Sequence, residues 1–223
     1  MANMGFEGFS FECFHFLAEL EDNNNDAWFN KNRGRYVEFV RQSMLALAER
    51  LLPAVLEIDP DIDTDMANIV PMQRLDKRFS SKRHPYSESA IISFHKKGCN
   101  AYDGFSLYFC IDPMTYAYGM GTYTRLPVFL KQYRENICSN GSAFLDTADA
   151  VADKGFVFNS HTTRRNVQRD ASEYMRKYLN VDSFTWERVS YALKSASMPS
   201  LADEVEQGYR VLAPLYRIIT GMT

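Results

Sequence analysis

Segments with the alternating pattern of β-strands lie together in the middle of the chain, and helical patterns lie toward its two ends. The stretches SAIISFH, GFSLYFCID and TYAYGMGTYT follow one another between residues 89 and 124. In the second stretch, alternate residues from Phe105 to Ile111 are apolar, as in a half-buried strand. Asp112 and Pro113 supply a turn, so we expect the third stretch to be a hairpin partner. Because no β-α-β order repeats, the pattern predicts an α+β fold with a mainly antiparallel central sheet and helices from both ends packed on it.

The N-terminal part has the spacing of two helices. FSFECFHFLAEL, residues 9–20, predicts the first. The second is predicted from Asn25 or Asp26, either of which can cap its start, to about Leu52. Pro53 should lie near its end, because proline disfavours a helical conformation in the residue before it.

The C-terminal part mixes helical and strand patterns. Helices are predicted over residues 127–138, 142–153 and 169–179, and strands over 155–159 and 183–193. A last apolar stripe runs from Leu201 to Ile219, where Pro214 should kink or break the helix. We expect one domain, residues 1–223, with a helical part at about 9–57, a sheet-rich part at about 69–124 and a mixed, helical part at about 125–220.

Composition narrows the class of protein. A chain of 223 residues with 46% hydrophobic and 24% charged residues is typical of a globular protein. No signal-peptide pattern precedes Gly5, and the apolar runs are shorter than a membrane span. The cysteines are scattered, which favours reduced thiols and a cytoplasmic location. A net charge of −3 makes nucleic acid an unfavoured partner, although it does not exclude one.

The most concentrated charge lies in RLDKRFSSKRHPY, residues 74–86. One acid, Asp76, faces five fixed cations: Arg74, Lys77, Arg78, Lys82 and Arg83. Guanidinium groups bind phosphate and carboxylate through paired donors, and the hydroxyls of Ser80 and Ser81 add further donors. Two interpretations follow. The segment is a stiff anion-binding loop, or a solvated loop in which Arg78 pairs with Asp76 or with the acidic run EIDPDIDTD.

A second polar-aromatic cluster lies in AWFNKNRGRY, residues 27–36. At helical spacing, Trp28 and Asn32 share one face, while Phe29, Arg33 and Tyr36 share the neighbouring face. A helix start beside arginines can hold an anion, but the aromatic side chains equally suit a core.

The spacing of residues in this chain does not match the known motifs for binding metals or nucleotide cofactors. In the acidic run, an EF-hand loop starting at Asp61 needs glycine and glutamate where the chain has Met66 and Met72. His95 and Cys99 have no second spaced pair, as a structural zinc site requires. The two glycines of GMGTY lack the context of a nucleotide-binding loop and favour close packing across a sheet. We therefore predict no metal site, and the cofactor, if there is one, stays unknown.

The two clusters together resemble the uncharacterised bacterial and fungal proteins grouped as domain of unknown function 2461. The similar positions are Asn23, Asn24, Trp28, Phe29, Asn32, Arg33 and Tyr36, then Asp76, Arg78, Phe79, Ser80, Pro85 and Tyr86, and later Arg134, Glu135 and Ile137. The chain departs from the family pattern at Leu75, Lys82, Arg83 and Ser87. The resemblance spans most of the chain and implies a shared pocket, but no agreed activity.

The leading hypothesis is a protein that binds an anionic, phosphate-bearing small molecule. The predicted ligand-binding residues are Arg78 as the main clamp, Arg33 and Ser80 assisting it, Trp28 and Tyr86 as an aromatic wall, and Asn32. Asp76 would orient Arg78 and is the candidate proton carrier if there is catalysis.

Two alternatives stay open. In one, the basic loop belongs to a non-catalytic interaction module that binds an acidic protein or nucleic acid. In the other, the motif is a structural ion-pair network without a ligand. The sequence does not indicate an oligomeric state.

Overall fold

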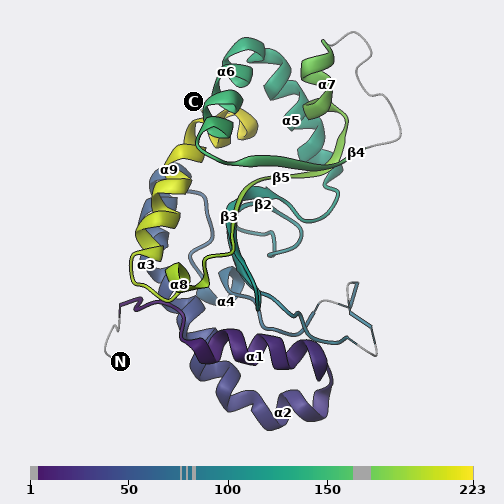
Figure 1. Cartoon of the computed structure of the whole chain (residues 1–223). Helices are drawn as coiled ribbons and strands as arrows, with labels where there is room; N and C mark the ends of the chain where they lie inside the picture. The colour runs from purple at the N-terminus through teal and green to yellow at the C-terminus, as the bar shows by residue number, and fades with distance from the viewer. Residues whose placement is uncertain (1–4, 76, 79, 82–83, 163–171, 223) are drawn as a thin grey trace.

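The protein is described here from a computed structural model that covers residues 5–75, 77–78, 80–81, 84–162 and 172–222. A central sheet has helices against one face and at both ends (Figure 1). Its strand order is β1-β2-β3-β5-β4, and each neighbouring pair is antiparallel. The strands are β1 (Ala90–His95), β2 (Phe105–Ile111), β3 (Tyr116–Thr122), β4 (Val157–Thr162) and β5 (Val181–Ser190). The predicted α+β fold with an antiparallel sheet is confirmed.

The helices form groups that follow the order of the chain. The N-terminal group is α1 (Phe11–Asp22), α2 (Asp26–Arg35), the π-helical η1 (Tyr36–Arg41), α3 (Gln42–Ile58) and α4 (Met66–Ile69). The C-terminal group is α5 (Pro127–Ser139), α6 (Gly141–Asp153), α7 (Glu173–Leu179), α8 (Leu193–Ala196) and α9 (Leu201–Thr220). In Figure 1, α3 and α9 run beside the sheet, α1 and α2 lie below it, and α5, α6 and α7 lie above it.

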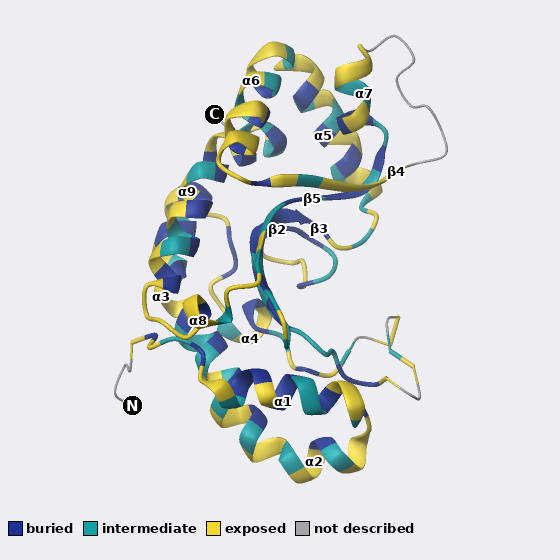
Figure 2. Cartoon of the chain, in the orientation of Figure 1, coloured by how far each residue is buried: buried dark blue, intermediate teal, exposed yellow. Residues whose placement is uncertain are grey.

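The two faces of the sheet differ in chemistry because side chains alternate along each strand. Leu107, Met120 and Trp186 are register partners across β2, β3 and β5, and all three are buried on the face toward the helices. The helix α9 adds Tyr209, which is fully buried, to the same core. The dark inner surface of α9 in Figure 2 follows this apolar stripe. The opposite face of the sheet carries mainly small and polar residues, such as Ser106, Ala117, Gly121 and Thr185.

Two prolines lie inside helices rather than at their ends. Helical backbone continues from Asp26 through η1 to Ile58, so α3 runs past Pro53, contrary to the prediction that the helix ends near it. The helix α9 likewise continues through Pro214 to Thr220. Pro53 and Pro214 are exposed, so water can satisfy the carbonyl that each proline leaves without an N–H partner.

The acidic run is only partly solvated: Glu57, Asp61 and Asp65 are exposed, whereas Asp59 and Asp63 are buried. Asp59 is fully buried, where it accepts a hydrogen bond from the Tyr216 hydroxyl at 2.8 Å and lies 3.4 Å from the Lys96 ammonium. Asp63 is also buried and accepts from the Asn68 amide at 2.9 Å. Asp59 therefore connects the end of α3 to α9 and to the loop after β1, and Asp63 connects to α4.

Candidate functional site

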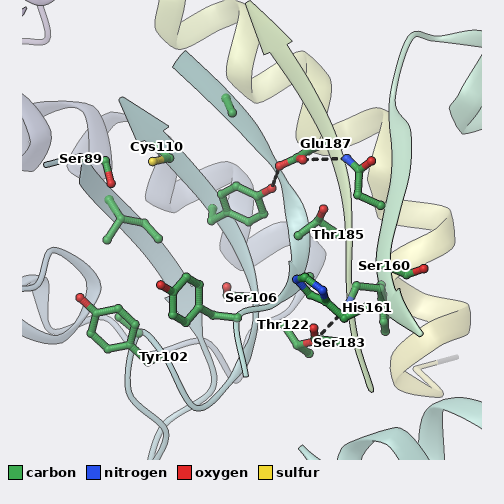
Figure 3. A pocket seen from close by; sticks show the side chains of 18 of the residues that line it. Ser89, Tyr102, Ser106, Cys110, Thr122, Ser160, His161, Ser183, Thr185 and Glu187 are labelled. Carbon is green, nitrogen blue, oxygen red and sulfur yellow. Dashed lines mark hydrogen bonds between the residues drawn. The ribbon is translucent and has the colours of Figure 1, made fainter. Parts of the chain in front are cut away.

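The face of the sheet that points away from the helices carries a cleft of about 680 Å³. Small-molecule sites in proteins usually fall between about 300 and 1,000 Å³. Half of the residues that line it carry a hydroxyl group (Figure 3): Ser87, Ser89, Tyr102, Ser106, Tyr108, Thr122, Tyr123, Ser160, Ser183 and Thr185. Hydroxyl groups both donate and accept hydrogen bonds, so this lining can match a ligand that does the same.

The floor of the cleft is low because β3 has the smallest side chains there. Ala117, Gly119 and Gly121 occupy the cleft face of this strand. A Cβ atom on Gly119 would lie 2.0 Å from the carbonyl oxygen of Trp186, and one on Gly121 would lie 2.3 Å from that of Phe184. The glycines thus allow β3 and β5 to approach closely, and the sequence-based interpretation of GMGTY as close packing across a sheet is confirmed.

A carboxylate lies in the middle of this face. Glu187 on β5 is opposite Gly119 on β3, which is in turn opposite Tyr108 on β2. Because Gly119 has no side chain, the Tyr108 hydroxyl reaches across β3 and donates a short hydrogen bond to Glu187 Oε2. Asn159 of β4 donates its amide to the other oxygen, Oε1, at 2.8 Å. Figure 3 shows Glu187 with a hydrogen bond on each side.

The local environment keeps two neighbouring groups protonated. Burial, and then the Glu187 charge, raise the pKa of Tyr108 far above its usual range, so the phenol stays a hydrogen-bond donor. Burial raises the pKa of Cys110 to about 11. A thiol with this pKa is almost wholly protonated at neutral pH, which makes Cys110 a poor nucleophile.

The connection between β1 and β2 lines both this cleft and a second cavity of about 500 Å³. Tyr102 of this connection lines the first cleft and packs edge-on against Tyr123 at a ring distance of 5.4 Å. The adjacent Asp103 lines the second cavity, which is mainly apolar and includes Phe105 and Tyr216. The connection is therefore a shared wall.

The two sequence clusters meet at Tyr86. Its ring stacks on Phe29 with a centroid distance of 3.9 Å, and its hydroxyl donates to Asp26 at 2.8 Å. Arg74 pairs with the same Asp26 oxygen at 2.6 Å. The Asn24 side chain accepts from the Tyr86 backbone N–H and donates to its carbonyl, at 3.0 and 2.9 Å. Tyr86 is buried, so these contacts fasten α2 to the segment that precedes β1.

The other predicted residues of α2 face α1 or solvent. Trp28 packs against Phe16 of α1 at a ring distance of 5.4 Å. Asn32 donates its amide to the Trp28 carbonyl at 3.0 Å and accepts from Arg35 at 3.2 Å. Arg33 is exposed. These contacts stabilise the helix pair α1 and α2.

Arg78 is paired with an aspartate that the sequence did not suggest. Its two terminal nitrogens donate to the two Asp103 oxygens at 2.7 and 2.8 Å. The described partner of Arg78 is therefore in the β1–β2 connection rather than on α2. Ser80 is half-buried, whereas Asp76, Phe79, Lys82 and Arg83 lie outside the described residues. Leu75 and Ser87, near the two ends of the basic segment, both line the cleft.

Sequence reasoning missed the central polar residues of the cleft. Tyr108 and Glu187 are 79 positions apart, and the sequence does not show that β5 pairs with β3. One signal was available. Polar or small residues at Ser106, Tyr108 and Cys110 alternate with apolar ones, which indicates a second face that is not part of the core.

Comparisons place the chain in a family without assigning an activity. No helix among the described residues is both long enough and apolar enough to cross a membrane. No curated protein matches the sequence. A family model described as conserved hypothetical protein (DUF2461) matches residues 12–217, which confirms the resemblance drawn from the two motifs. The chain belongs to this DUF2461 family.

Proposed function

We propose that the protein binds a small, hydroxyl-rich molecule, such as a sugar or polyol, in the cleft on the open face of the sheet. The observation that carries the proposal is the hollow above Ala117 and Gly121, which has hydroxyl groups around it on the side without helices. A sheet surface that is only solvated has no need of this hollow, whereas a ligand does. The rings of Tyr102 and Tyr123 offer apolar faces beside polar groups, as sugar-binding sites require.

The chemistry of the lining favours a ligand without a large negative charge. The described residues that line the cleft include no lysine or arginine. A phosphate group deep in the cleft would therefore lose its hydration without gaining a described cation. The part of the ligand that lies on the sheet is better matched by hydroxyl or amide groups.

Binding of an anion at the border of the cleft is the second candidate. It is favoured by the position of the basic segment, whose Leu75 and the following Ser87 line the cleft. Arg78 would then have to exchange Asp103 for the ligand, or bind the anion while paired. We assign Tyr86 a structural role in either case, because Phe29, Asn24 and Asp26 already hold its ring, backbone and hydroxyl.

The experiment is thermal unfolding against a panel of sugars, polyols, nucleosides, sugar phosphates and inorganic phosphate. A ligand at about 100 times its dissociation constant adds roughly 2.7 kcal/mol, or a shift of roughly 5–10 °C for a protein of this size. The test variant is Ala117→Phe, which fills the hollow from its floor. Ala152→Phe on the exposed surface of α6 is the matched control.

The outcomes separate the candidates. A shift that Ala117→Phe abolishes and Ala152→Phe keeps supports binding in the cleft. A shift with phosphate compounds alone, lost in a folded Arg78→Ala variant, supports the anion site at the border. Binding of a polyanion that weakens steeply with added salt would instead indicate a basic interaction surface. If no compound of the hydroxyl-rich classes gives a shift sensitive to Ala117→Phe, the proposal is wrong.

A further inference from the structure

We propose that the molecule bound in the cleft carries a protonated amine and that Glu187 provides its counter-charge. The inference rests on the proposed function and specifies the ligand as an amine. Among the lining residues within the described ranges, Glu187 is the one acidic side chain, and none is a fixed cation. The one histidine among these described lining residues, His161, lies on the exposed edge strand β4.

The Glu187 carboxylate has acceptor capacity that its protein partners leave unused. Each oxygen of an ionised carboxylate can accept about two hydrogen bonds. Tyr108 supplies one donor to Oε2, and Asn159 supplies one to Oε1. The described partners thus fix the plane of the carboxylate from both sides, and further positions on the oxygens remain for donors that enter from the cleft.

A purely structural role explains less of this arrangement. A cross-strand link between β2 and β5 would need only the Tyr108 hydroxyl and a neutral acceptor. A half-buried carboxylate is instead costly, and two neutral donors compensate its charge less well than a cation does. An ammonium group offers three donors and one full charge, so it can satisfy both oxygens at once.

The surroundings of Glu187 favour an amine attached to a polar body. Ser89, Ser106 and Thr185 lie in the same cleft and can accept or donate to hydroxyl groups of that body. Tyr108 does not act as a competing proton source, because burial and Glu187 raise its pKa. An amino sugar or an amino alcohol has this combination of one ammonium group and several hydroxyl groups.

The test uses matched pairs of probes that differ in the charge of one group: glucosamine against glucose and N-acetylglucosamine, and ethanolamine against ethylene glycol. Binding is measured by thermal unfolding and by titration, for the wild type and for Glu187→Gln. Glutamine keeps the size and an acceptor oxygen for Tyr108 but removes the charge. Glu49→Gln, at an exposed position of α3, controls for the change in net charge.

In the wild type and in Glu49→Gln, we expect at least one amine to bind more tightly than its neutral counterparts. In Glu187→Gln, the amine should bind roughly tenfold more weakly, since a charged hydrogen bond at a partly exposed site is lost. Equal binding of amines and neutral counterparts in the wild type would overturn the inference, and so would an amine preference that survives Glu187→Gln.

The results also distinguish this inference from the proposed function. Neutral sugars or polyols that bind in a manner sensitive to Ala117→Phe, without any preference for amines, refute the role of Glu187 and leave the cleft as the binding site. Absence of binding by every hydroxyl-rich and amine probe refutes both. Loss of neutral and amine binding together in Glu187→Gln would show that Glu187 positions Tyr108, and would also refute the inference.

Discussion

The close contact between β3 and β5 predicts that a single added Cβ atom at Gly119 destabilises the protein. In Gly119→Ala, the new Cβ would lie 2.0 Å from the Trp186 carbonyl oxygen and 2.8 Å from the Glu187 Cα. Both neighbours are backbone, so no side chain can rotate away. The strands would have to separate locally by about 1.5 Å to restore an ordinary contact distance.

The cost follows from that separation. It would stretch the adjacent ladder hydrogen bonds, each of which contributes about 0.5–1.5 kcal/mol. Overpacking of a dense region typically costs about 1–3 kcal/mol more. The reduced freedom of the unfolded chain returns only about 0.4–1 kcal/mol. We therefore expect a loss of roughly 2–4 kcal/mol, which lowers the Tm by about 5–15 °C.

The assay is thermal and urea unfolding of the wild type, Gly119→Ala and Gly34→Ala. Gly34 lies in α2, where a Cβ meets nothing within 4 Å. The same substitution should there stabilise the protein by about 0.5–1 kcal/mol, since alanine is the better helix former. A Gly119→Ala variant as stable as the wild type would refute the close approach of β3 and β5, and with it the shape of the cleft.

Three further predictions concern the motif around Tyr86 and the cysteines. Tyr86→Phe keeps the stacking on Phe29 but loses the hydrogen bond to Asp26, so unfolding in urea should show a loss of about 1 kcal/mol; an unchanged midpoint would contradict this. Hydrogen bonds from Arg74 and then Tyr86 lower the pKa of Asp26, so its contribution is present above about pH 4 and is lost as the pH falls through the lowered pKa. The stability difference between wild type and Asp26→Asn should shrink between about pH 4 and pH 2, and a constant difference would contradict the assignment. Because burial raises the pKa of Cys110 to about 11 while Cys99 and Cys138 are exposed, iodoacetamide at pH 7.5 should label Cys99 and Cys138 before Cys110. Mass spectrometry can show the order, and early labelling of Cys110 would contradict this prediction.

Helices and strands were predicted well where the apolar residues follow a single helical or strand periodicity over the whole segment. Alternation from Phe105 to Ile111 and the apolar stripe of α9 both correspond to observed elements. The prediction was wrong at Pro53, because the rule that proline ends a helix assumes that the freed carbonyl has no other partner, and this proline is exposed.

The candidate site was harder to predict because it depends on pairing between distant strands. The charge of the basic segment predicted a ligand site there. In the structure, however, Tyr86 packs on Phe29, and Arg78 forms an ion pair with Asp103. Glu187 lies in an ordinary strand pattern and gains its position only from the β3–β5 register. That register is a property of the whole fold and has no local signature in the chain.

The order of strands in the sheet also has a consequence for folding. Consecutive strands β1, β2 and β3 form a meander, and β4 pairs with β5, so each ladder can form from neighbouring segments of the chain. Among the described strands, the meander and the β4–β5 pair join where β3 meets β5, and this junction runs through the floor of the cleft. Long-range pairing of this kind is the slow step in many β-sheet proteins. We expect the cleft to form late, so a ligand should protect the amides along the β3–β5 junction from hydrogen exchange while leaving the early folding of the meander unchanged.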